Sequence, residues 1–335
     1  MCAQPHIAIV TTCSASKARA ERGTVDLKEI PADLPPWERA KAWIERLERA
    51  PILPIAVEKL YQGPHWKQSV LAYENASRFS RVSLWVLSAG YGLVEANRNI
   101  RLKPYQATFS IEGSFGDNSN CVSPLGLSLT ERTGYERAWW QALSDWEAPF
   151  GQSPRTLSRL VAEQEVDAML VIASNNYLKV IETELKDAAA SLAQPDRLIV
   201  ISAGASNQLR QRLSGHMVQF DKRLAQRLGG ALGSLNARTA AWLVEQLNFE
   251  KFTLSDAQRI LDQTLADIPK EVRVARTPMS AEEVRAYLRA QPDIFEASAT
   301  RLLWRFRRED LNSLEGKHFK RLVAEVKASL SSTPI

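Results

Sequence analysis

The sequence has little that would mark a disulfide-stabilised, metal-binding or membrane protein. Its three cysteines, Cys2, Cys13 and Cys121, are irregularly spaced and form no CxxC pair, which argues against a disulfide framework or a zinc site. The longest apolar runs are only as long as strands, and the N-terminus lacks the basic segment and apolar core of a signal peptide. We therefore expect a reducing, cytoplasmic protein that needs no metal and no organic cofactor.

Common motifs of nucleotide-binding and hydrolytic enzymes are missing as well. There is no GxxxxGK[ST], no GxSxG and no HExxH, and the four histidines show no ligand spacing. The segment GGALGS near Gly229 follows a helical pattern and not a strand, so it does not fit a dinucleotide-binding fingerprint. The formal net charge of +5 permits a polyanionic partner but does not require one.

Four short apolar runs are typical of central strands in a parallel sheet that is covered on both faces. They are Ile7–Val10, Val82–Ala89, Ala168–Ser174 and Leu198–Gly204. Helical patterns separate them, which predicts an α/β fold with a mostly parallel sheet of about four strands flanked by helices. Two local signals predict helix starts, Ser153-Pro154 and the capping box of Ser280 with Glu283.

The pattern changes twice along the chain. Residues 93–129 are rich in Gly, Asn, Ser and Pro, and we predict a long lid loop there, packed by aromatic side chains such as Tyr105 and Phe109. Short helical patterns replace the strands in the C-terminal part. We therefore predict an α/β domain over residues 1–250 and an all-α domain over residues 251–335.

Small polar residues follow each predicted strand. Ligands of parallel sheets bind outside the carboxyl ends of the strands, so we expect these residues to form one pocket of hydroxyl and amide groups. Tyr61 and His65, in a turn before a helix, are expected beside it. For any single strand end, a helix cap is the simpler interpretation. The predicted pocket residues at the strand ends are Cys13, Ser14, Ser16, Lys17, Ser88, Ser174, Asn175, Ser202 and Asn207.

The C-terminal part interleaves basic and aromatic residues in RLLWRFRRED and GKHFKRLVAEVK. Such segments contact phosphates and stack on bases, but they also occur as ordinary amphipathic surface helices. The predicted nucleic-acid contacts are Arg301, Arg305, Arg307, Arg308, Lys317 and Lys320, with Arg19 in the first domain.

Four motifs together resemble a family of small bacterial and phage domains. They are V-x-x-C-S-x-x-K (Val10–Lys17), E-K-L-Y-x-G-P (Glu58–Pro64), L-S-A-x-Y-G-L (Leu87–Leu93) and I-x-x-x-P-Y (Ile100–Tyr105). That family is similar to YaaA-type stress proteins and, more distantly, to the uracil-DNA-glycosylase-like domain of archaeal tRNA transglycosylases and archaeosine synthases.

The resemblance implies a uracil-DNA-glycosylase-like fold and chemistry on nucleobases, in a family found near DNA-modification and phage-defence functions. It also implies a site lined by Cys13, Ser14, Ser16, Lys17, Ser88, Tyr91 and Tyr105. The sequence lacks the GQDPY and HPS loops of true uracil glycosylases, so their water-activating aspartate has no matching position here.

The leading hypothesis is a DNA glycosylase that flips a modified, bulky base of double-stranded DNA into the pocket and leaves an abasic site, as a step of antiphage defence. Asp117, Asn118 or Asn175 would stabilise the developing positive charge on the sugar or orient a water, although Asp117 also fits a turn. Lys17 would hold a flanking phosphate, or form a Schiff base with the sugar and nick the strand. The alternatives are a non-catalytic DNA-binding stress protein, a base-exchanging transglycosylase, and an enzyme acting on free nucleotides.

Overall fold

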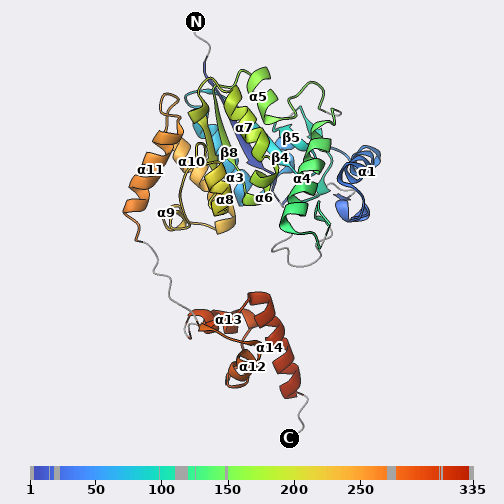
Figure 1. The fold of residues 1–335 in the computed structure, drawn as a ribbon, viewed down its shortest axis with the longest axis vertical. Helices are drawn as coiled ribbons and strands as arrows, with labels where there is room; N and C mark the ends of the chain where they lie inside the picture. Colours follow the sequence, from blue (N-terminus) through green and yellow to red (C-terminus); the bar gives the residue numbers. More distant parts are fainter. Residues whose placement is uncertain are drawn as a thin grey trace. The chain divides into compact units, whose positions relative to one another are not determined.

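The computed structural model describes residues 4–14, 16–18, 23–97, 99–109, 120–124, 126–147, 150–269, 277–308, 310 and 312–331. The chain divides into two compact units, residues 1–269 and 270–335 (Figure 1). Each unit has its own cluster of buried apolar side chains. The predicted boundary at residue 250 is therefore too early.

A five-stranded sheet forms the centre of the first unit, in the order β5-β4-β1-β8-β9. The strands are β1 (His6–Thr12), β4 (Arg81–Ser88), β5 (Gly92–Glu95), β8 (Ala168–Ile172) and β9 (Leu198–Ile201). Strands β4, β1, β8 and β9 are parallel, and β5 pairs antiparallel with β4. The four predicted strands and their parallel arrangement are confirmed, because apolar runs buried on both faces identify such strands.

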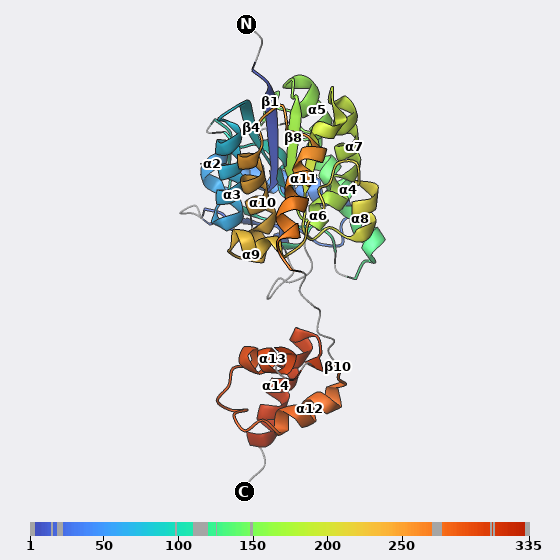
Figure 2. The ribbon, with the colours of Figure 1, turned by 90° about the vertical axis from the view of Figure 1, so that its left-hand side faces the viewer.

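Helices cover both faces of this sheet. Figures 1 and 2 show α3, α10 and α11 on one face and α4, α5 and α7 on the other. Since both faces are covered, side chains of β1 from Ile7 to Val10 are fully buried. The helices of the unit are α1 (Pro36–Arg49), α2 (Val57–Leu60), α3 (Gly63–Ala76), α4 (Leu129–Ser144), α5 (Leu157–Glu163), α6 (Asn175–Val180), α7 (Glu182–Ser191), α8 (Asn207–Arg212), α9 (Leu224–Leu228), α10 (Leu235–Gln246) and α11 (Leu254–Ala266).

The first part of the predicted lid is not a loop. It contains β5 and the short strands β6 (Arg101–Leu102) and β7 (Tyr105–Gln106). Strand β6 pairs with β3 (Ile55–Ala56), and β7 pairs with β2 (Val25–Asp26). The side chains of Leu102, Tyr105 and Phe109 are buried, and this burial holds the segment on the body of the unit. Residues 110–119 lie outside the described residues.

Helix α11 explains why the domain boundary lies later than predicted. Its buried side chains, Ala257, Leu261 and Leu265, belong to the core of the first unit. The second unit contains α12 (Ala281–Arg289), α13 (Ala299–Arg308), α14 (Gly316–Ser331) and one pair of two-residue strands, β10 (Thr277–Pro278) and β11 (Asn312–Ser313). The capping box of Ser280 and Glu283 starts α12 as predicted.

None of the helices that the structure describes combines the length and the apolar character that a membrane crossing requires.

Candidate functional site

The sheet has one topological switch point, between β1 and β8. The chain leaves β1 towards β4 on one side, and it leaves β8 towards β9 on the other. The loops that follow these two adjacent strands therefore diverge and leave a crevice at their carboxyl ends. Open α/β sheets bind their ligands in such crevices.

A pocket of about 380 Å³ occupies this crevice, and we call it the switch-point pocket. Its volume lies within the range of about 300–1,000 Å³ that is usual for small-molecule sites. No Asp, Glu, Lys or Arg is among the described residues that line it, and His65 contributes an imidazole. The residues that line it are Thr12, Cys13, Ser14, Ser16, Gln62, Gly63, Pro64, His65, Ser174, Ala231, Gly233, Ser234 and Asn236.

Backbone hydrogen bonds shape the loop after β1. The Gln62 amide donates to the Ser16 carbonyl over 3.0 Å, and the Ala18 amide donates to the Leu60 carbonyl over 2.8 Å. The Ser14 hydroxyl donates to the Ser16 carbonyl and accepts from the Gln62 amide. These bonds join two of the motifs that the resemblance rests on, and they present Ser14 and Ser16 to the pocket.

Lys17 is not among the residues that line the pocket. Its Nζ donates to the Ser14 carbonyl over 2.9 Å and lies 4.4 Å from the centre of the Tyr105 ring. Burial lowers the pKa of Lys17, while the neighbouring Cys13 opposes that shift. Through these two contacts, the lysine stabilises the packing of the loop after β1 against the core.

This placement gives a prediction for Lys17→Ala. We expect the variant to unfold at lower urea concentration, with a loss of about 1–3 kcal/mol, because a charged hydrogen bond and a cation–π contact disappear. We also expect an unchanged salt dependence of DNA binding. A salt slope smaller by about one charge would instead assign Lys17 to a phosphate.

His65 is the most constrained polar group of the pocket. It lies in the first turn of α3, and its Nε2 is 3.0 Å from the Thr11 hydroxyl and 3.3 Å from the Thr12 hydroxyl. Burial lowers the pKa of His65 to about 4, so the imidazole is neutral at neutral pH. Its Nδ1 makes no hydrogen bond within the described residues. A neutral imidazole can accept a proton or donate a hydrogen bond there.

Three predicted site residues lie below the pocket and not in its lining. Tyr105 is fully buried, and its hydroxyl is 2.6 Å from the Ser88 hydroxyl and 3.2 Å from the Tyr61 hydroxyl. Ser88 also accepts the backbone amide of Tyr91 over 2.9 Å. Ser88, Tyr91 and Tyr105 thus form a hydrogen-bonded part of the core under the loop after β1.

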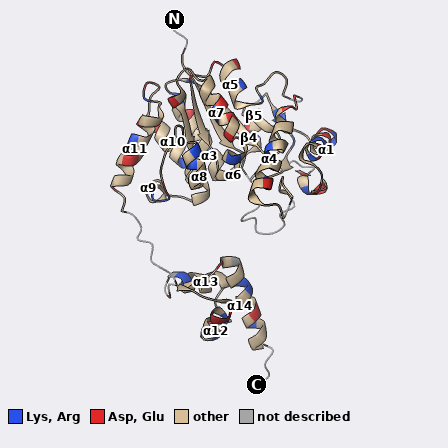
Figure 3. Cartoon of the chain, in the orientation of Figure 1, with Lys and Arg blue, Asp and Glu red and all other residues tan. Residues whose placement is uncertain are grey.

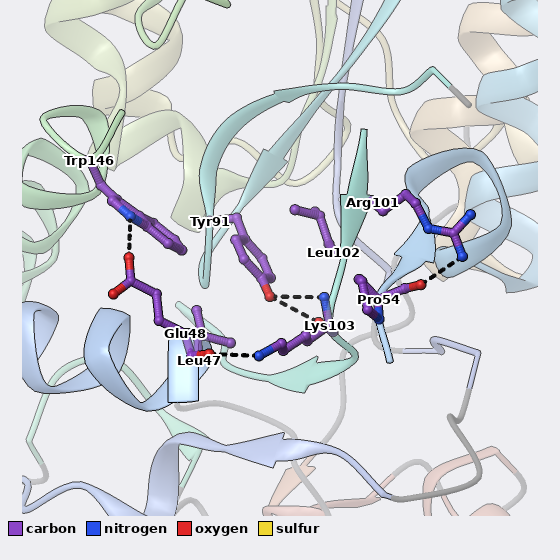
Figure 4. A pocket seen from close by; sticks show the side chains of 8 residues that line it. All are labelled: Leu47, Glu48, Pro54, Tyr91, Arg101, Leu102, Lys103 and Trp146. Carbon is purple, nitrogen blue, oxygen red and sulfur yellow. Dashed lines mark hydrogen bonds between the residues drawn. The ribbon is translucent and has the colours of Figure 1, made fainter. Parts of the chain in front are cut away.

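Tyr91 and its neighbours surround a second pocket, of about 280 Å³, shown in Figure 4. The Tyr91 hydroxyl exchanges hydrogen bonds with the backbone of Lys103, and the Lys103 ammonium donates to the Glu48 carbonyl. The Trp146 indole donates to the Glu48 carboxylate over 3.2 Å. These polar groups bind one another, so this pocket offers little to a polar ligand.

Ser174 lines the pocket, but the other predicted residues after β8 and β9 do not. The Asn175 side chain accepts the Ser206 amide over 3.0 Å and ties the loops after β8 and β9 together. Ser202 is fully buried, and Asn207 is exposed at the start of α8. Only the ends of β1 and β8 meet at the switch point, whereas all four ends were expected to converge.

Sequence reasoning missed three residues that belong to this region. The Tyr177 hydroxyl is 3.0 Å from the Cys13 sulfur, and the neighbouring Asn175 is the residue that the sequence predicts for the pocket. Asn236 lines the pocket and bridges two strand ends, because its amide donates to the Ala173 carbonyl and accepts from the Ala203 amide. Ser234 ends the Gly-rich segment GGALGS and also lines the pocket. A serine before a helical run was the signal that could have found it.

Glu136 is a buried acid that the sequence did not single out. It lies on α4 and accepts a hydrogen bond from the Ser123 hydroxyl over 3.2 Å. Burial raises the pKa of Glu136 to about 7, against the opposing effect of the Ser123 hydrogen bond. It does not line the switch-point pocket.

A raised carboxyl pKa makes the folded state less stable as the group ionises. Between pH 5 and pH 8.5, ionisation of Glu136 is expected to cost about 2.5 kcal/mol, so Glu136→Gln should gain about that much stability at pH 8.5 relative to pH 5. Urea unfolding at both pH values measures the difference. Glu163→Gln, which removes an exposed carboxylate paired with Arg159, is the control. Equal shifts in both variants would contradict the account.

The basic residues of the second unit have mixed surroundings. Arg305 forms a bidentate ion pair with Asp293, at 2.8 and 2.9 Å, and Arg307 donates to the Leu314 carbonyl over 2.7 Å. Arg301 and Lys320 are exposed, as is the aromatic side chain of Trp304. Figure 3 shows Lys and Arg along these helices, with acidic residues among them. Arg308 and Lys317 lie on α13 and α14, and their side chains are outside the described part.

Some predicted residues lie outside the described residues altogether. They are Arg19, Asp117 and Asn118. Within the ranges that the structure describes, no cluster of three or more His, Cys, Asp or Glu side chains is arranged to hold a metal ion. Comparison with models of protein families, with curated proteins and with solved structures finds no match.

Proposed function

We propose that this protein is a DNA glycosylase that hydrolyses the N-glycosidic bond of a modified, bulky base. The observation that carries the proposal is the switch-point pocket itself. It is lined by hydroxyl, amide and imidazole groups at the carboxyl ends of β1 and β8. Groups that both donate and accept hydrogen bonds suit the edge of a nucleobase better than a charged metabolite.

The chemistry proposed for the pocket centres on His65. As the glycosidic bond breaks, negative charge develops on the departing base and positive charge on the sugar. A neutral imidazole, held by Thr11 and Thr12, can donate a hydrogen bond from Nδ1 to the base in the tautomer that places the proton there. We assign the orientation of the water to Asp117 or Asn118, which lie between Phe109 and Asn120 in the sequence.

Two further features support a DNA substrate. The second unit carries thirteen Lys and Arg against nine Asp and Glu, so most of the net charge of +5 belongs to 66 of the 335 residues. The loop motifs resemble a family of small bacterial and phage domains that is distantly similar to the uracil-DNA-glycosylase-like domain. This resemblance supports chemistry on nucleobases and a uracil-DNA-glycosylase-like fold. A role in phage defence would follow if the modified base is one that phages incorporate.

The proposal is tested by incubating the full-length protein with plain, uracil-containing and hypermodified phage DNA, followed by alkali and heat. We expect strand breaks only in the hypermodified DNA, and only after alkali. Breaks without alkali would indicate an accompanying lyase step. Intact DNA in all three samples, with binding in a gel shift, would replace the enzyme by a DNA-binding protein.

A further inference from the structure

The Gly-rich segment Gly229–Ser234 lies beside the switch-point pocket, although it is far from the other lining residues in sequence. Gly229 and Gly230 have φ angles of +66° and +72°, which favour glycine. The segment leads into α10, and it lines the switch-point pocket through Ala231, Gly233 and Ser234. It also lines an adjoining pocket of about 690 Å³, which we call the Arg238 pocket.

Arg238 lies at the wall of this second space with most of its hydrogen-bonding capacity unused. Its side chain is 8% exposed, and its Nη2 donates to the Ala231 carbonyl over 2.6 Å. Its Nε and Nη1 are buried and have no hydrogen-bond partner within the described residues. A buried donor left without a partner costs about 1–3 kcal/mol, and more when it is charged, so an arrangement like this one suits a ligand that is still to bind.

Gly230 packs directly against the guanidinium of Arg238. A Cβ at this position would lie 2.8 Å from Nη1 and 3.0 Å from Cζ of Arg238. Two features therefore favour glycine at this position: its positive φ angle and the close approach of the arginine side chain. The conformation of the Gly-rich segment and the placement of Arg238 are linked.

The charges around the Arg238 pocket favour an anion. No acidic residue lies in the first turn of α10, and no Asp or Glu is among the described residues that line either pocket. Lys67 is a further cation at the pocket wall. The first N–H groups of a 12-residue helix add a partial positive charge.

We propose that Arg238, the Gly229–Ser234 segment and the start of α10 form a phosphate site. The unpartnered Nε–H and Nη1–H groups of Arg238 are charged donors that suit the oxygen atoms of phosphate. Because the two pockets share Gln62, Gly63, Pro64, Ala231 and Ser234, the bound phosphate would lie next to the base. That the phosphate belongs to the DNA strand, adjacent to the flipped nucleotide, rests on the proposed function.

The first test titrates the full-length protein with inorganic phosphate by calorimetry. Arg238→Gln should weaken phosphate binding by about 10-fold or more, because a charged hydrogen bond is lost. Arg238→Lys should retain part of the affinity, and Arg159→Gln, at a distant surface ion pair, should match the wild type. If Arg238→Gln does not fold, Gly230→Ala is measured instead, since it retains the charge but crowds the guanidinium. Phosphate binding that is equal in all folded variants would overturn the proposal.

The second test identifies the source of the phosphate. Single methylphosphonate linkages are scanned along a substrate DNA that the wild-type protein binds. One neutral linkage beside the target nucleotide should weaken wild-type binding by about 10-fold and have no further effect on Arg238→Gln. Inorganic phosphate binding through Arg238 without any base release would retain the anion site and reject the glycosylase. Base release with a methylphosphonate effect that is the same in both proteins would support the glycosylase and reject Arg238 as the contact of the strand phosphate.

Discussion

Replacing His65 by glutamine is expected to slow base release by about 100-fold or more, the usual size of one positioned acid–base or hydrogen-bonding group. Glutamine can still reach the hydroxyls of Thr11 and Thr12, so the loop after β1 should remain in place. The measurement is single-turnover release of the base from modified DNA. His216→Gln is the matched control, because His216 is also partly buried but does not line the switch-point pocket. Equal rates in the wild type and His65→Gln would remove His65 from the chemistry.

The same variant should change the acid stability of the protein. The pKa of His65 is lowered by burial to about 4, so the folded state resists the protonation that the unfolded chain accepts near pH 6.5. Stability is therefore complete above pH 6.5 and falls as the pH drops towards 4, by about 2.5 kcal/mol between pH 7.5 and pH 4.5. His65→Gln should lose less stability over that interval than the wild type. An identical pH profile would mean that His65 is accessible to protons in the folded state.

Removal of residues 270–335 is expected to weaken binding of plain DNA by about 10- to 100-fold near 0.1 M salt, and to reduce the salt slope by several charges. The first unit should remain folded, since its buried cluster contains no residue of the second. Turnover of a short modified duplex at saturating concentration should be retained, because the switch-point pocket lies within residues 12–236.

A full-length control separates charge from the presence of the domain. Arg301→Glu with Lys320→Glu reverses two exposed cations while the buried cluster of the second unit stays intact. We expect this double variant to reproduce much of the effect of the truncation. Unchanged DNA affinity in both proteins would mean that the second unit has another partner.

The architecture of the first unit could be predicted because its signals are local. Apolar runs such as Ile7–Val10 are buried on both faces, and this pattern identifies parallel strands without tertiary information. Ser153-Pro154 shows the limit of local signals. The helix begins instead at Leu157, and the Thr156 side chain caps it. Arg155 is buried in the core, where it donates hydrogen bonds to the carbonyls of Tyr91 and Leu143, so the chain before Leu157 is not helical.

The domain boundary and the composition of the pocket were harder to predict, because both depend on contacts between residues far apart in the sequence. The apolar face of α11 predicts that the helix packs against other elements. It does not indicate which of the two units supplies those elements. Cys13, Ser14, Ser16 and His65 were found from the strand ends and the turn before α3, and they do line the pocket. Asn236 comes from a helix more than 200 residues after β1, and only the folded sheet brings it to the same crevice.

Mass spectrometry of the products from hypermodified DNA is the most direct test of the central claim. The account predicts equal amounts of the free modified base and of an abasic strand, both produced by the wild type and strongly reduced in His65→Gln. A strand of unchanged mass with no free base would contradict a glycosylase. A free base accompanied by a strand that carries a new base would assign the pocket to base exchange.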